Sequence, residues 1–201
     1  MRELHVILDN GHGNDTVGKR SPVWSDGTQL LEWEFNRNIV NRIQQILPRD
    51  GVTSTRLVPE LFDISITDRI VRANRIIAAS NKDGCQCLLI SVHGNAGKGT
   101  GFEVFTSIGK TRSDIVAQLF CDHAPEYLKG FPVRTDLRDG DGDKESDGIS
   151  LLPKSHCPAV LTENLFMDRQ RDCYYMQSES GRQAIAEMHV RVIREYRKGT
   201  Q

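Results

Sequence analysis

Two histidines in this sequence each follow a largely apolar run and stand beside a glycine. The run Leu4–Leu8 precedes His12, and the run Leu88–Val92 precedes His93, which Gly94 follows. A continuous apolar run bounded by glycine is typical of a strand that is buried on both faces. Neutral imidazole is a common ligand of metal ions. The two strand ends therefore indicate two metal ligands that converge on one point.

A third ionisable side chain, Glu163, follows another short apolar run, Ala159–Thr162. In a parallel sheet the carboxyl ends of the strands share one edge, where α/β proteins place their ligand sites. We therefore expect His12, His93 and Glu163 to meet at one crevice. A catalytic zinc site uses three protein ligands and leaves a position for water, and two histidines with one glutamate are a known set.

The helix predicted over residues 30–47 offers a further carboxylate. At about 100° per residue, Glu32 lies roughly 60° from Phe35, within the apolar stripe, whereas Glu34 lies roughly 100° to the other side. A carboxylate on a buried face needs a compensating partner, and a zinc ion is one such partner. We therefore expect Glu32 to face the sheet and Glu34 to be solvated.

The elements that position these residues alternate between strands and helices. This alternation predicts one α/β domain over residues 1–201, with a central, mostly parallel, twisted sheet of about five to six strands and helices on both faces. Residues 9–25 and 130–149 are predicted to be loops. The predicted strands are Leu4–Leu8, Val52–Val58, Cys87–Val92, Phe102–Thr106 and Ala159–Thr162, and the predicted helices are Leu30–Leu47, Thr67–Ser80, with Thr67 and Asp68 as caps, Ser113–Leu128 and Ser178–Arg197.

Composition excludes several functional classes. The chain has 201 residues and a formal net charge of −1, so it lacks the basic surplus of a nucleic-acid-binding protein. It has no apolar run of the roughly 18 residues that a membrane span needs, and no signal peptide is visible. Five scattered cysteines do not resemble a secreted disulfide framework, so we expect free thiols and a reducing cytoplasm as the site of synthesis.

The same residues fit other structural and functional roles less well. A single histidine after a strand is more often a structural residue than a ligand, so the case for a metal rests on the pair. The glycines lack the spacing of a phosphate-binding loop. The acidic stretch Asp139–Asp143 suggests calcium, but an EF-hand loop counted from Asp139 would need glycine and glutamate where Lys144 and Ser150 stand. Residues 139–148 are therefore interpreted as an acidic flexible loop.

Six short motifs lie between residues 8 and 166, nearly the whole chain. They are Leu8-Asp9-Asn10-Gly11-His12-Gly13, Glu32-Trp33-Glu34-Phe35-Asn36, Asp68-Arg69 with Ala73-Asn74, Ser91-Val92-His93-Gly94-Asn95-Ala96, Gly101-Phe102-Glu103-Val104-Phe105 and Pro158-Ala159-Val160-Leu161-Thr162-Glu163-Asn164-Leu165-Phe166. Taken together and in this order, they resemble one family: the zinc-dependent N-acetylmuramoyl-L-alanine amidases of the amidase-3 type, which cleave peptidoglycan. The chain departs from the family at Asn14, where a second glycine is frequent, and in the acidic segment 139–148.

The resemblance implies a fold like that of the amidase-3 enzymes and zinc exopeptidases. It also implies zinc bound by His12, Glu32 and His93, with Glu163 as the catalytic carboxylate that hydrolyses the bond between N-acetylmuramic acid and L-alanine. Four further residues are candidates for substrate binding. Lys19 and Arg20 follow the first ligand, Asn95 follows the second, and His156 precedes the last predicted strand.

Two other functions share these features. One is a zinc amidohydrolase or carboxypeptidase that acts on a small peptide, and the other is an inactive wall-binding module of the same fold. Peptidoglycan is the expected partner, and the chain is expected to be a monomer. It is expected to be made in the cytoplasm and to reach the cell wall by phage-type release or another export route.

Overall fold

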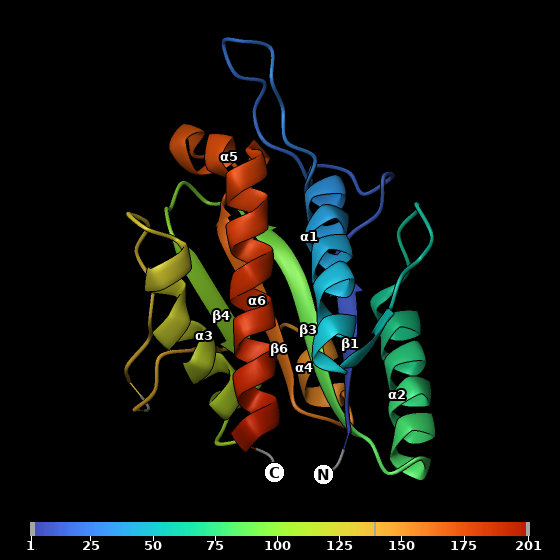
Figure 1. The fold of residues 1–201 in the computed structure, drawn as a ribbon. Coiled ribbons are helices and arrows are strands. Elements are labelled where there is room, and N and C mark those ends of the chain that lie inside the picture. Colours follow the sequence, from blue (N-terminus) through green and yellow to red (C-terminus); the bar gives the residue numbers. More distant parts are fainter. Residues whose placement is uncertain (1–2, 139, 200–201) are drawn as a thin grey trace.

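The computed structural model describes residues 3–138 and 140–199. Within them the chain forms one six-stranded sheet in the order β2-β1-β3-β6-β4-β5, with helices on both faces (Figure 1). The strands are β1 (Leu4–Asn10), β2 (Thr53–Arg56), β3 (Gln86–Asn95), β4 (Phe102–Thr106), β5 (Lys144–Glu145) and β6 (Ala159–Phe166). The helices are α1 (Glu32–Ile46), the 3-10 turn η1 (Leu47–Asp50), α2 (Ile66–Lys82), α3 (Ser113–Tyr127), α4 (Leu151–Lys154), α5 (Gln170–Gln177) and α6 (Glu179–Gly199).

The sheet is parallel except at one pair of strands. β1 runs parallel to β2 and β3, β3 runs parallel to β6, and β4 runs parallel to β5, whereas β4 runs antiparallel to β6. Only residues 96–101 connect β3 to β4. A parallel crossover needs a dozen or more residues, so this short connection reverses the chain. The predicted mostly parallel sheet is confirmed, and the carboxyl ends of β1, β3 and β6 share one edge.

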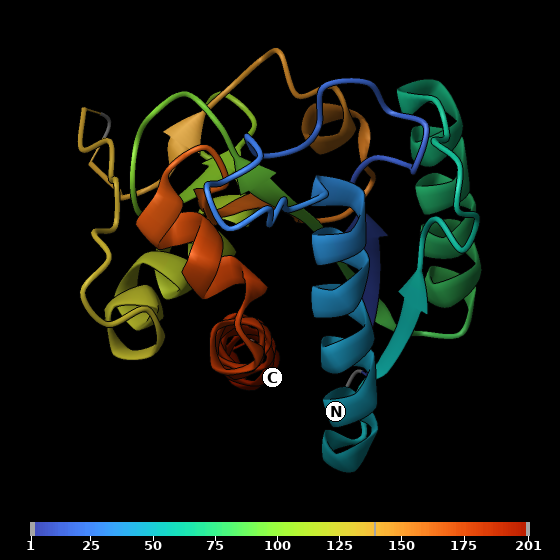
Figure 2. The ribbon, with the colours of Figure 1, turned by 90° about the horizontal axis from the view of Figure 1, so that it is seen from above.

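Two apolar layers cover the sheet. Helices α1, α3 and α6 pack on one face, and α2 and α4 pack on the other (Figures 1 and 2). Successive side chains of β3 point to opposite faces, so Leu88 and Ile90 enter the first layer and Leu89 the second. All three are fully buried, which confirms that this apolar run is a strand covered on both faces.

The two central strands extend further than predicted. β3 continues to Asn95 and β6 continues to Phe166, so His93 and Glu163 lie within paired strands rather than after them. These two residues are direct neighbours in the register of β3 and β6, and the register shifts between His93 and Asn95. The strands continue through polar residues because backbone pairing between neighbouring strands outweighs the modest β-propensity of individual side chains.

Several shorter elements differ from prediction. The cap of α2 is Ser65, whose hydroxyl accepts a hydrogen bond from the backbone N–H of Asp68, and not Thr67 or Asp68. The loop predicted over 130–149 contains the short strand β5, and Asp143 is buried there, where it accepts a hydrogen bond from Thr106. Helices α4 and α5 were not predicted, because each is short and its apolar positions are few.

Helix α6 carries a fully buried histidine, His189, whose neutral form the fold favours. Its Nδ1 lies 2.8 Å from the carbonyl oxygen of Ile185 and its Nε2 lies 3.0 Å from the hydroxyl of Thr162. Because a carbonyl oxygen only accepts, Nδ1 must carry the proton of the neutral ring. Nε2 then accepts a hydrogen bond from the hydroxyl of Thr162. Burial lowers the pKa of His189 to about 4.

This histidine is expected to make the fold acid-sensitive. The unfolded chain binds a proton at His189 below pH ~6.5, whereas the folded chain does so only near pH 4, so stability falls as pH drops between these values. The full loss is about 3 kcal/mol. Urea unfolding at pH 7 and pH 4.5 measures it. The pH-dependent loss should shrink in His189→Gln and persist in His156→Gln, and an equal loss in all three proteins would refute the assignment.

Candidate metal centre and active site

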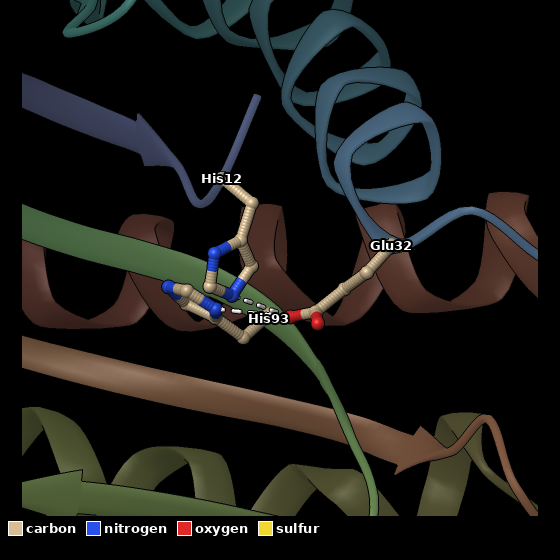
Figure 3. A group of neighbouring side chains, drawn as sticks. All are labelled: His12, Glu32 and His93. Carbon is tan, nitrogen blue, oxygen red and sulfur yellow. Dashed lines mark hydrogen bonds and ion pairs between the residues drawn. The ribbon is translucent and has the colours of Figure 1, made fainter. Parts of the chain in front are cut away.

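Three side chains from separate elements converge at the carboxyl edge of the sheet (Figure 3). His12 follows β1, His93 lies in β3, and Glu32 is the first residue of α1. Glu32 Oε1 lies 3.3 Å from His12 Nε2 and 3.1 Å from His93 Nδ1. One ligand atom from each residue lies within 4.8 Å of the other two. Among the described residues these three side chains are the group that could hold a metal ion.

Helix α1 fixes the backbone that carries His12. Asn36 Nδ2 donates a hydrogen bond to the carbonyl of Gly11 at 3.0 Å, and Arg37 Nη1 donates to the carbonyl of His12 at 2.9 Å. His12 has a φ of 64°, in the left-handed region that a residue with a side chain adopts rarely. These two hydrogen bonds stabilise that conformation and so set the direction of the imidazole.

Glycine at position 11 lets the two imidazoles approach each other. A Cβ atom on Gly11 would lie 2.0 Å from the His93 ring, so any other residue would displace that ring. The rings of His12 and His93 lie edge to face, with centroids 4.9 Å apart. The close packing of the two imidazoles thus depends on a position without a side chain.

The chemistry of the three residues fits a cation. Glu32 is 1% exposed, and neither its Oε2 nor the Nε2 of His12 makes a hydrogen bond within the described residues. Each atom has only an ion-pair contact, at 4.0 Å to Lys19 Nζ and at 3.3 Å to Glu32 Oε1 respectively. Unpartnered buried polar atoms are rare in folded proteins, and a bound metal ion would satisfy both. Glu34 is exposed to solvent. The helix-phase prediction that Glu32, and not Glu34, faces the sheet is confirmed.

Glu163 lies next to this triad, opposite His93 on the neighbouring strand. Its Oε2 is buried and has no hydrogen-bond partner among the described residues. Burial, the largest cause, and the nearby carboxylate of Glu32 raise the pKa of Glu163 to about 7, although His93 opposes the shift. A carboxyl group with such a pKa can exchange a proton near neutral pH. His12, His93 and Glu163 line one cavity of about 530 Å³.

The floor of this cavity contains a buried ion pair. Arg69 of α2 donates to the carboxylate of Asp9 and, at 2.7 Å, to that of Asp63. The hydroxyl of Ser91 donates to the second oxygen of Asp9 at 2.5 Å. The pair joins β1, β3 and α2 beneath the ligands. Arg69 lies on the buried stripe of α2 with Ala73 and Ile77, the same kind of signal that singles out Glu32 on α1.

The four predicted substrate-binding residues occupy different places. Lys19 lines the cavity, and its Nζ lies 4.0 Å from Glu32 Oε2. Arg20 is exposed and is not part of the cavity lining. Asn95 uses its side chain within the protein, because Nδ2 donates to Glu103 at 2.7 Å and Oδ1 accepts from the N–H of Ala96 at 2.7 Å.

His156 does not lie at the site. It precedes β6 at the amino end of that strand, where its backbone N–H donates to Asn74. Glu163 lies four residues into β6, so roughly 13 Å of extended strand separate it from the amino end of that strand. His156 is close to the last strand in sequence, and this led to the expectation that it lies at the site. The site lies at the carboxyl end of β6, whereas His156 precedes its amino end, and the length of the strand could not be predicted from sequence.

The remaining sequence predictions have mixed outcomes. All five cysteines lie within the described residues and form no disulfide there. No helix in that part of the chain is long and apolar enough to cross a membrane. Asp139 lies outside the described residues, and residues 148–150 of the adjoining segment line the cavity. Neither a calcium site nor a flexible loop over 139–148 is tested, so the latter stays a prediction.

Comparison with known proteins assigns the chain to a family. The profile of the amidase-3 family, N-acetylmuramoyl-L-alanine amidase, matches residues 6–195. The endolysin of Bacillus phage SPP1 is 30% identical over 196 residues, which cover 94% of this chain and 65% of the endolysin. The amidase CwlM of Bacillus licheniformis is 27% identical, with 92% of this chain and 66% of CwlM covered.

Solved structures show the same fold. The crystal structure of an N-acetylmuramoyl-L-alanine amidase from Clostridium difficile 630 superposes with a TM-score of 0.82 at 23% identity, and both chains are covered completely. The profile match extends over nearly the whole chain and includes all three candidate ligands and Glu163. The chain therefore belongs to the amidase-3 family of N-acetylmuramoyl-L-alanine amidases.

Proposed function

We propose that this chain hydrolyses the amide bond that joins the lactyl group of N-acetylmuramic acid to L-alanine in peptidoglycan. One observation carries the proposal: two histidines of a candidate metal-binding triad, His12 and His93, line the same cavity as Glu163, a carboxylate with an unpartnered oxygen. Membership of the amidase family supports this substrate class.

Zinc is the metal that this ligand set fits. Two imidazoles and one carboxylate form an established catalytic zinc site, with a fourth position left for water or substrate. His12, Glu32 and His93 would hold the ion. When bound, zinc supplies Lewis acidity, which lowers the pKa of water and polarises an amide carbonyl.

Glu163 is the proposed general base and general acid. Its carboxylate accepts a proton from the attacking water as the water oxygen bonds to the lactyl carbonyl carbon. It then donates that proton to the amide nitrogen as the carbon–nitrogen bond breaks. The products are a lactyl carboxylate and a stem peptide with a free L-alanine amino group. Burial raises the pKa of Glu163, which favours a carboxyl group that can both accept and return a proton.

Lys19 is the residue of the first loop that is best placed to meet the substrate. It lines the cavity on the side of Glu32, whose backbone N–H donates to the carbonyl of Lys19 at 3.0 Å. A bound cation at Glu32 would compete with the ammonium group for that carboxylate. Lys19 would then be available to a substrate oxygen.

Mass spectrometry of digested peptidoglycan tests the proposal. Purified, zinc-loaded protein should release intact stem peptides that begin with a free L-alanine, and it should leave glycan strands with lactyl carboxylates. Stem peptides shortened from the carboxyl end would identify a carboxypeptidase instead. An absence of any product would indicate an inactive wall-binding module.

We propose the following biological setting for this activity. The protein would be made in the cytoplasm and act on the cell wall after phage-type release or another export route. We also propose that it acts as a monomer: the four residues of the site come from one chain, so a second copy is not needed to complete it.

A further inference from the structure

A second carboxylate, Glu103, faces Glu163 across the antiparallel pair of β4 and β6. The two residues are direct partners in the register of these strands, so their side chains lie on the same face of the sheet. Glu103 is 5% exposed. Two neighbouring buried carboxylates repel each other, so one of them needs compensation from other groups.

Two cations compensate Glu103, which is one more than its charge requires. Arg134 Nε and Lys144 Nζ each lie 2.5 Å from Glu103 Oε1, and Asn95 donates to Oε2. Burial alone would raise the pKa of Glu103, but the hydrogen bonds from Lys144 and Arg134 lower it below its ordinary value. Lys144 alone balances the charge of Glu103, so Arg134 is not needed to neutralise that carboxylate.

The guanidinium of Arg134 is held in place while its outer nitrogens stay free. Its Nε is bound to Glu103, and its planar head lies over the ring of Phe166, 5.3 Å from the centroid. No described residue accepts a hydrogen bond from either terminal nitrogen, and the side chain is 42% exposed. A fixed guanidinium with two free terminal nitrogens matches the two oxygens of a carboxylate.

We propose that Arg134 binds a carboxylate of the stem peptide and that Glu103, Lys144 and Phe166 hold it ready to do so. This inference rests on the proposed amidase function. The length of the stem between the scissile bond and Arg134 favours the α-carboxylate of D-glutamate, the second residue of the stem. Neither Arg134 nor Glu103 lines the cavity, but Arg134 contacts Glu103, and cross-strand neighbours such as Glu103 and Glu163 have Cβ atoms about 5 Å apart. Two extended residues span about 7 Å, so we expect the second stem residue to be the one that meets Arg134 at the margin of the cavity.

Two small substrates that differ only in charge test this subsite. N-acetylmuramoyl-L-Ala-D-Glu, with its γ-carboxyl blocked as the methylamide, carries the α-carboxylate. N-acetylmuramoyl-L-Ala-D-isoGln, blocked in the same way, carries a neutral amide at that position. The zinc-loaded wild type should favour the acid by about tenfold or more in kcat/KM, mainly through KM, because a charge-assisted hydrogen bond is lost with the amide.

Variants show whether Arg134 causes that preference. In Arg134→Gln the ratio of kcat/KM for the acid to that for the amide should fall to about one. In Arg134→Lys it should be intermediate, because lysine keeps the positive charge but lacks the two parallel N–H donors of the guanidinium. Arg138→Gln makes the same change of charge nearby at an exposed side chain and should keep the wild-type ratio.

The outcomes separate the subsite from the amidase activity. A wild type that cleaves both substrates equally, or an Arg134→Gln variant that keeps the preference for the acid, overturns the subsite and leaves the amidase activity standing. A wild type that cleaves neither substrate nor peptidoglycan overturns both. A wild type that cleaves peptidoglycan but neither small substrate also overturns the subsite, because the dipeptide would then not contain the determinants of recognition.

Discussion

Replacing Glu163 by glutamine is expected to lower the turnover of peptidoglycan by about 10²- to 10⁴-fold, the usual contribution of a positioned general base. Glutamine has nearly the same shape but cannot accept and return the proton. Glu163 lies opposite His93 within the cavity, yet it is not one of the three residues grouped as metal ligands. Release of new L-alanine amino groups from purified peptidoglycan measures the effect.

Two controls keep this result interpretable. Glu163→Gln should bind as much zinc as the wild type, so its defect would be in proton transfer and not in metal binding. Glu34→Gln makes the same chemical change at an exposed position of α1 and should have near-normal turnover. If Glu163→Gln were fully loaded and retained normal turnover, the assigned role would be wrong.

Replacing Arg69 by leucine is expected to destabilise the fold by about 3–5 kcal/mol, because it leaves the buried carboxylate of Asp9 without its partner. The side chains of Arg69 and Asp9 are 5% and 3% exposed, so solvent cannot replace the lost contact. Urea unfolding at pH 7 measures the change in the free energy of unfolding. Adding Asp9→Asn to Arg69→Leu should recover part of the loss, since it removes the unpaired charge.

A second ion pair on the same helix is a matched control. Arg72 pairs with Glu60 at 2.8 Å, but both side chains are about one-quarter to one-third exposed. Exposed pairs contribute about 1 kcal/mol or less, so Arg72→Leu should have a small effect. Equal losses in Arg69→Leu and Arg72→Leu would contradict the view that burial makes the Arg69 pair important.

The convergence of the ligands could be predicted from sequence because it depends on strand direction and helix phase. Alternation of strands and helices predicts a parallel sheet whose carboxyl ends share an edge, and His12 and His93 lie there. The angular position of Glu32 among the apolar residues of α1 predicts that it is buried, and it is. Arg69 on the buried stripe of α2 carries the same signal.

The supporting contacts could not be predicted, because they depend on tertiary structure. Arg37 lies outside the apolar stripe of α1, yet it is buried where the loop that carries Glu60 covers it. Glu103 looks like an ordinary strand residue until the antiparallel pairing places it opposite Glu163. His156 is a residue that the sequence wrongly suggested for the site. It is close to β6 in sequence but precedes the amino end of that strand, and the site lies at the carboxyl end.

A crystal structure of the zinc-loaded chain tests the central claim most directly. We predict one zinc ion bound by His12, Glu32 and His93, with Glu163 beside it and not among the ligands. An ion bound by Glu163 in place of one of these three, or zinc bound elsewhere with the triad empty, would contradict the division between metal ligands and catalytic carboxylate on which the proposed function depends.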